Sequence, residues 1–311
     1  MSPDALRVGT RASALATAQS GQIARRLGSA ELVEIVSDGD RSTASLDSLG
    51  GTGVFASALR DALLAGEVDV IVHSAKDLPT APADGIRIAA FPTRVDARDV
   101  LVSRGGLTLE ALEPGAVVGT GSPRRRAQLL AARPDVQVVG IRGNVDSRLR
   151  RVLDAEHPDP LDAIVLAAAG LDRLGRLGDV TEYFDLNRWP TAPAQGALAV
   201  EIRVDAPRDL QARVVALDHR STRLAVEAER AVLAVLEAGC AAPLGARATL
   251  DDGLLFLTAS VYALDGSAKV TASHAGYPED SDDPAAELAA RVAAELLELG
   301  AGELAPIGGR S

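Results

Sequence analysis

Short apolar runs alternate with amphipathic stretches along the first two-thirds of the chain, and this alternation limits the fold more than any other feature. It is typical of an α/β domain whose strands are largely parallel. One set predicts strands at 6–10, 31–36 and 68–74 and helices at 13–27 and 55–66. A second set predicts strands at 116–121, 136–141 and 162–170 and helices at 124–132 and 145–153. We therefore expect two α/β lobes with mixed, mainly parallel sheets.

The pattern changes in the last third of the chain. After a strand at 192–203 that returns toward the first lobe, a long helix is predicted at 220–238, antiparallel strands at 254–264 and 269–276, and a closing helix at 284–300. This predicts a small α+β domain. A chain of 311 residues exceeds the usual size of one compact domain. We expect three domains: 1–93 with 194–216, then 94–193, then 217–311.

Composition excludes several classes of function. The net charge of -11 argues against a nucleic-acid binder, which needs a basic face. No apolar run approaches the roughly 20 residues that cross a bilayer. The start of the chain lacks a basic segment followed by an apolar one, and there is a single cysteine, so we expect a cytoplasmic protein. The four histidines are scattered, which predicts no metal site.

A basic segment stands out from the acidic average. Residues 119–151 hold eight arginines and two acids. Within it, "GTGSPRRRAQLL" places a glycine-rich turn and arginines at a helix start, where backbone amides and the helix dipole favour an anion. Solvated surface charge is the alternative interpretation. However, arginines oppose the dipole at a helix start, so helix stability does not explain them.

Two other stretches follow predicted strands. "VHSAKDLPT" carries Lys76 and Asp77 past the end of one strand, and "IRGNVDSRLRR" carries Arg142 and Arg148 past another. Ligands of open α/β sheets collect beyond the carboxyl ends of the strands. A carboxylate there can stabilise a cationic intermediate. A surface ion pair and an exposed basic helix are the respective alternatives.

The only cysteine, Cys240, lies in "LEAGCAAPLGA" after the long helix. It has no second cysteine with which to form a disulfide or share a metal. A small buried apolar side chain is the default interpretation of such a residue.

Taken together and in order, these stretches resemble the porphobilinogen deaminases, also called hydroxymethylbilane synthases. The resemblance covers the chain from residue 6 to about residue 246, and the last 65 residues match in pattern only. The matching elements are "RVGTRASALA", "LGGTGVFASAL", "VHSAKDLPT", "RDVLVS", "GTGSPRRRAQL", "IRGNVDSRL", "DAIVLAAAGLDRLG", "APAQGALAVE" and "AERAVLAVLEAGCAAPLGA".

The resemblance implies an enzyme of tetrapyrrole biosynthesis that joins four porphobilinogen molecules head to tail, releases four ammonia molecules and hydrolyses off linear hydroxymethylbilane. Its dipyrromethane cofactor would be held by a thioether to Cys240. Loss of ammonia leaves an azafulvene cation, and the family's catalytic aspartate corresponds to Asp77. Each pyrrole carries two carboxylates, which arginines would neutralise. We expect a monomer that binds neither nucleic acid nor membrane.

The resemblance also implies a set of binding residues. Those expected to contact the cofactor and the growing chain are Arg11, Ser13, Lys76, Thr120, Ser122, Arg124, Arg125, Arg142, Gly143, Arg148 and Arg173. Phe55 is expected to stack near the pyrroles, and Gln195 lies on the return connection between the lobes.

One loop departs from the family pattern. Thr52 stands where many relatives have lysine, which puts contacts from this loop to the substrate in doubt. We expect the loop at 37–53 to shift as the product lengthens.

Two other functions remain as alternatives. Both lobes also resemble periplasmic-type binding proteins, so a non-catalytic binder of a small anion is one. It predicts neither Cys240 nor the third domain. A phosphate-binding transferase is the other, but the chain lacks a Walker-type lysine in "GTGSPRRR".

Overall fold

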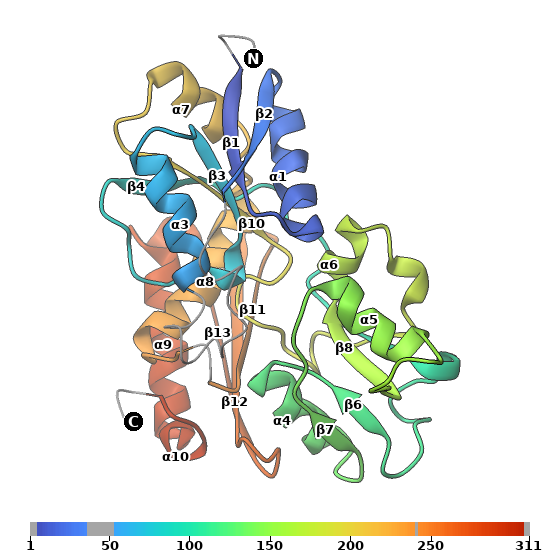
Figure 1. Ribbon diagram of the computed structural model, residues 1–311. Helices are drawn as coiled ribbons and strands as arrows, with labels where there is room; N and C mark the ends of the chain where they lie inside the picture. Colours follow the sequence, from blue (N-terminus) through green and yellow to red (C-terminus); the bar gives the residue numbers. More distant parts are fainter. Residues whose placement is uncertain (1–4, 36–52, 240–241, 308–311) are drawn as a thin grey trace. The chain divides into compact units, whose positions relative to one another are not determined.

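The computed structural model describes residues 5–35, 53–239 and 242–307. Cys240, Thr52 and the loop 37–52 lie outside the described residues. The chain forms two compact units: unit 1 is Met1–Val95 with Ala197–Arg223, and unit 2 is Asp96–Gly196 with Leu224–Ser311. Each unit is built around its own sheets (Figure 1).

Unit 1 contains a five-stranded sheet of order β2-β1-β3-β10-β4. Its strands are β1 (Leu6–Thr10), β2 (Ala30–Glu34), β3 (Val70–Ser74), β4 (Ile86–Ala90) and β10 (Leu198–Arg203). All run in one direction except β10, which is antiparallel to both neighbours.

Helices cover both faces of this sheet. They are α1 (Ala14–Leu27), α3 (Gly53–Leu64) and α7 (Arg208–Val215). Val70 and Val72 point toward one face and share a core with residues of α1 and α7. Ile71 points to the other face and packs with residues of α3. This alternation is the two-residue period of a strand buried on both faces.

Unit 2 contains a second five-stranded sheet, of order β7-β6-β8-β5-β9. Its strands are β5 (Asp99–Ser103), β6 (Val117–Gly119), β7 (Gln137–Val139), β8 (Ala163–Ala167) and β9 (Glu182–Tyr183). Here β5 is the single strand antiparallel to its neighbours. The order therefore repeats that of unit 1, with β5 in the place of β10.

The second sheet is also covered on both faces. Its helices are α4 (Pro123–Ala132), α5 (Val145–Leu153) and α6 (Ala168–Arg173). Leu129 of α4 packs in one core with Val118 and Val165. Leu149 of α5 and Leu171 of α6 pack in a different core.

A three-stranded antiparallel sheet completes unit 2. Its strands are β11 (Leu244–Asp251), β12 (Leu254–Tyr262) and β13 (Lys269–Gly276), in that order. The helices α8 (Arg220–Val235), α9 (Pro284–Glu298) and α10 (Ala301–Leu304) supply the rest of its core. The first four residues of α8 belong to unit 1. Among the described residues, no helix is both long and apolar enough to span a membrane.

The predicted α/β class is confirmed: there are two α/β lobes with mixed, mainly parallel sheets, and a small C-terminal α+β part. Two strand predictions were wrong. The strand expected at 192–203 begins only at Leu198. The segment 162–170 is not one strand, because β8 ends at Ala167 and α6 begins in the alanines that follow, which favour a helix. Several strands were not predicted, among them β4, β5 and β11. The boundaries of the three domains stay a prediction.

Candidate functional site

In unit 2, predicted site residues gather at one edge of the second sheet. β7, β6 and β8 are parallel neighbours, so their carboxyl ends lie at the same edge. Thr120 and Ser122 follow β6, and Arg142 and Gly143 follow β7. The backbone N–H of Ile141 donates to the Thr120 carbonyl at 3.4 Å, which joins the two loops.

The loop after β6 forms a tight turn into α4. Ser122 caps the helix, its hydroxyl accepting from the backbone N–H of Arg125 at 3.4 Å. Thr120 is buried, and its hydroxyl accepts from the N–H of Ser122 at 3.2 Å. A Cβ on Gly121 would lie 2.7 Å from the Ile141 carbonyl oxygen, so this position requires glycine. The turn thus holds the start of a helix, a place that favours anions, at the sheet edge.

The loop after β7 is similarly well defined. Gly143 adopts a φ of 97°, a conformation that disfavours other residues. Asn144 caps α5 by accepting from the N–H of Ser147 at 2.9 Å. Arg148 Nε donates to the Gly143 carbonyl at 2.8 Å. Arg142 is exposed, which leaves its guanidinium accessible from solvent.

Arg124 and Arg125 lie beneath this edge. Both are buried and pair with Asp99, a residue that is 0% exposed at the start of β5. Arg124 Nη1 lies 2.8 Å from Asp99 Oδ2, and Arg125 Nη2 lies 2.6 Å from Oδ1. Burial alone would raise the pKa of Asp99, but the two guanidinium charges and their hydrogen bonds hold it far below its usual range. The pairing with Asp99 explains why two arginines lie at the start of α4, where the helix dipole disfavours them. Their contact with ligand carboxylates stays a prediction.

Other buried groups complete the Asp99 cluster. Gln195, also buried, donates through Nε2 to Asp99 Oδ1 and to the Ala97 carbonyl, both at 2.8 Å. Trp189 Nε1 donates to Asp99 Oδ2 at 3.1 Å. Asp99 was not predicted as a site residue from the sequence. The signal was an acid at the start of the apolar run "DVLVS", because a carboxylate buried in a strand needs a cation beside it.

Arg173, the last residue of α6, carries an unused donor. Its Nη2 donates to the Gly196 carbonyl at 3.0 Å, whereas its buried Nε has no hydrogen-bond partner among the described residues. Burial lowers the pKa of Arg173, and the charge of Asp172 opposes this only in part. A ligand carboxylate would satisfy the Nε donor. The donors in this part of unit 2 therefore fit a polycarboxylate such as the predicted cofactor.

In unit 1, the remaining predicted residues follow β1 and β3, which are parallel neighbours. Arg11 and Ser13 follow β1, and the Ser13 hydroxyl caps α1 by accepting from the N–H of Ala16 at 3.2 Å. Lys76 and Asp77 lie in a 3-10 turn directly after β3, and Asp77 is exposed. Phe55 belongs to the first turn of α3, and its predicted stacking is outside what the structure describes.

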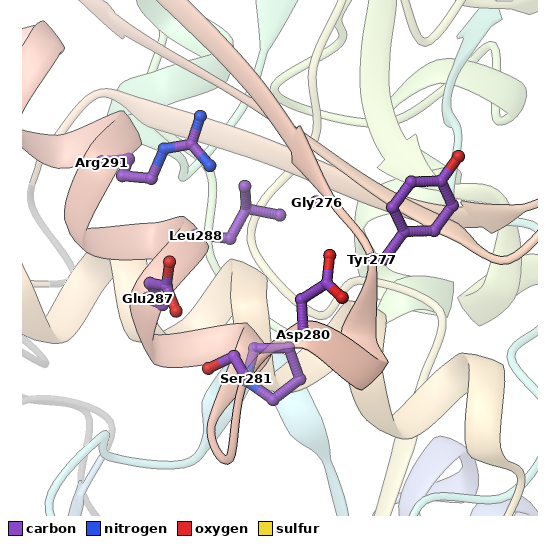
Figure 2. Close-up of a pocket in the computed structure, with 8 residues that line it drawn as sticks. Gly276, Tyr277, Asp280, Ser281, Glu287, Leu288 and Arg291 are labelled. Carbon is purple, nitrogen blue, oxygen red and sulfur yellow. The ribbon is translucent and has the colours of Figure 1, made fainter.

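A pocket in unit 2 is separate from these residues. It has a volume of about 120 Å³ and lies where β13 leads into α9 (Figure 2). Small-molecule sites usually measure roughly 300–1,000 Å³. The side chains that line it carry both signs of charge, and they belong to Gly276, Tyr277, Asp280, Ser281, Pro284, Glu287, Leu288 and Arg291. None of these is a predicted site residue.

Comparison with known families decides between an enzyme and a binder. A family model described as porphobilinogen deaminase, dipyromethane cofactor binding domain, matches residues 6–211. A second model, described as porphobilinogen deaminase, C-terminal domain, matches residues 223–298. The chain belongs to the porphobilinogen deaminase family.

Individual porphobilinogen deaminases are similar along nearly the whole chain. The one from Leifsonia xyli subsp. xyli is 56% identical over 98% of this chain and 95% of the relative. Those from Thermobifida fusca and Cutibacterium acnes are 51% and 50% identical, each over 97% of the relative. The predicted family, enzyme class and dipyrromethane cofactor are thereby confirmed, and the non-catalytic binder is not favoured. The roles of individual residues stay predictions.

Proposed function

We propose that this chain condenses four porphobilinogen molecules head to tail, releases four ammonia molecules and hydrolyses off linear hydroxymethylbilane. The observation that carries the proposal is the cofactor-binding family model, which spans both sheet edges at 6–211. When bound, the dipyrromethane supplies the primer carbon to which pyrrole units are added. Cys240, the only thiol of the chain, is its proposed attachment point. We further propose that the protein acts as a cytoplasmic monomer.

The unit 2 edge is proposed to hold the carboxylates of the cofactor. Arg142 and Arg148 supply positive charge, and the unused Nε of Arg173 supplies a buried donor. Thr120 and Ser122 shape the turn into α4, and Gly143 shapes the turn between Arg142 and the helix that carries Arg148. Bidentate arginine contacts suit a ligand with two carboxylates on every ring.

The unit 1 edge is proposed to carry the catalysis. Asp77 is exposed on a turn anchored to β3, so its carboxylate can accept hydrogen bonds from pyrrole N–H groups. It can also stabilise the positive charge that develops as porphobilinogen loses ammonia. Arg11, Ser13 and Lys76 lie at the same edge and are proposed to bind substrate carboxylates.

Intact mass spectrometry tests the attachment. We expect purified active protein to exceed the polypeptide mass by one dipyrromethane, and Cys240→Ser to have the bare mass and no turnover. A bare mass in active wild-type protein would rule out the covalent cofactor.

Substitution of Asp77 tests the catalytic role. We expect Asp77→Asn to lose turnover by at least about 100-fold, because the charge that stabilises the cation is removed, and Asp77→Glu to retain part of it. Asp84→Asn changes another exposed acid of unit 1 and serves as the control. Porphobilinogen consumption is the measurement, and near-normal turnover in Asp77→Asn would refute the assignment.

A further inference from the structure

The turn that carries Lys76 and Asp77 is anchored from both faces of the unit 1 sheet. His73 and Ser74 are the last two residues of β3, and they precede the turn directly. Consecutive strand residues point to opposite faces. The two side chains therefore reach different helices, and each meets a polar partner there.

On the α3 face, His73 belongs to a buried charged cluster. Glu201 of β10 is 1% exposed and receives two hydrogen bonds from Arg60 of α3, from Nη2 at 2.6 Å and from Nε at 3.0 Å. His73 Nε2 lies 3.2 Å from Glu201 Oε2 and has no well-directed hydrogen-bond partner among the described residues. Glu201 is opposite Ile71, so His73 is its diagonal neighbour on the same face.

On the α1 face, the side chain of Ser74 is held by a hydrogen bond between neutral groups. Gln19 is buried in α1 and donates through Nε2 to the hydroxyl of Ser74 at 2.8 Å. The backbone continues the anchoring, because the N–H of Ala75 donates to the Ala197 carbonyl at 3.0 Å. Ala75 and Leu78 are buried on either side of Lys76 and the exposed Asp77.

We propose that Arg60, Glu201, His73 and Gln19 are positioning residues, which hold the Lys76–Asp77 turn in its working conformation. This rests on the proposed function, in which Asp77 is the catalytic carboxylate. Replacing a whole buried ion pair by apolar side chains is often neutral for stability, whereas removing one partner is costly, so a pair that is kept can serve to fix one geometry. The cluster joins α3, β10 and the end of β3 only four residues before Asp77. A small displacement of that turn would misalign the carboxylate with a bound pyrrole.

The chain offers a matched control at the other end of the same strands. Arg7 of β1 pairs with Asp69, the residue before β3, with Nη2 and Oδ1 2.7 Å apart. This pair also joins two elements of the unit 1 sheet. It lies at the amino ends of the strands, away from the turn, so Asp69→Asn removes a partly exposed ion pair of the same sheet without touching the anchoring of Asp77.

The experiment compares Glu201→Gln, His73→Gln and Asp69→Asn with the wild-type protein in two assays. Hydrogen exchange of the backbone N–H groups in 74–78 measures the opening of the turn, and the porphobilinogen assay gives kcat and KM. His73→Gln keeps the Arg60–Glu201 hydrogen bonds, so it still tests the proposal if Glu201→Gln does not fold.

We expect exchange in 74–78 to become roughly 10-fold faster in both cluster variants and to stay unchanged in Asp69→Asn. We expect kcat to fall on the order of 10-fold to 100-fold with KM nearly constant, and Arg60→Lys to retain more activity than Arg60→Met. Unchanged exchange in both cluster variants would overturn the proposal. A kcat equal to that of the active wild-type protein in both cluster variants would also overturn it. If the wild-type protein has no turnover, the proposed function fails, while the exchange result still decides whether the cluster holds the turn.

Discussion

Replacing Asp99 by asparagine should destabilise unit 2 severely. The carboxylate is fully buried and accepts five hydrogen bonds, three at Oδ1 from Arg125 and Gln195 and two at Oδ2 from Arg124 and Trp189. Asparagine keeps a single acceptor oxygen, so at least two of these donors lose their acceptor. It also leaves two buried guanidinium groups without a counter-ion.

The magnitude follows from the burial. Breaking a buried ion pair by removing one partner costs about 3–5 kcal/mol. In a unit of this size, 1 kcal/mol corresponds to roughly 2–4 °C in melting temperature, so we expect a fall of about 6–20 °C. Thermal unfolding followed by circular dichroism measures it.

An exposed ion pair nearby provides the control. Asp96 pairs with Arg98 at 2.6 Å, and both side chains are more than a third exposed. Such pairs contribute about 0–1 kcal/mol, so Asp96→Asn should lower the melting temperature by no more than about 4 °C. If Asp99→Asn melts within about 3 °C of the wild-type protein, the Asp99 cluster does not stabilise the fold.

Two more predictions follow from single residues. Gly143→Ala should lower the free energy of unfolding by roughly 1–3 kcal/mol and lower cofactor content, because φ is 97° and the new Cβ would meet the Ser147 hydroxyl. Gly105→Ala is the control: its φ is 72° and a Cβ there would meet open space, so it should lose less stability in the same melting assay. Burial would raise the pKa of Glu201, but His73 and Arg60 lower it from 4.5 to about 2. The ionised Glu201 carboxylate therefore contributes about 3 kcal/mol to the free energy of unfolding above about pH 4.5, and this contribution is lost as the pH falls toward 2. In urea unfolding, the stability of Glu201→Gln should lack this decrease between pH 4.5 and pH 2.

Local periodicity was enough to predict most helices and strands. The strand Leu6–Thr10 and the helix Val145–Leu153 have the bounds that the sequence predicts. Apolar spacing and capping residues such as Asn144 act over one or two turns of chain, so they can be recognised without the fold. The strand β11 was missed because two of the four core-facing positions in its alternating pattern, Leu244, Ala246, Ala248 and Leu250, are alanine, a weak strand former.

The gathering of site residues at the carboxyl ends of strands also followed from the sequence. Parallel neighbours bring their ends to one edge, and this holds for β6 with β7 and for β1 with β3. Thr120, Ser122, Arg142 and Gly143 are consequently where the pattern predicted. Their motifs, taken in order, were also sufficient to indicate the family.

By itself, the sequence determined the fold class, the family and the strand ends at which chemistry is proposed, because these depend on short-range patterns and motif order. Only the tertiary structure decided which charged residues face one another in the interior. Arg124 and Arg125 meet an acid 25 and 26 residues away, and Arg60 meets one 141 residues away. The sequence gives the position of each arginine, but the sheet that brings distant strands together decides which acid lies beside it. In that buried environment an unpaired charge would be strongly destabilising, so each of these arginines is paired.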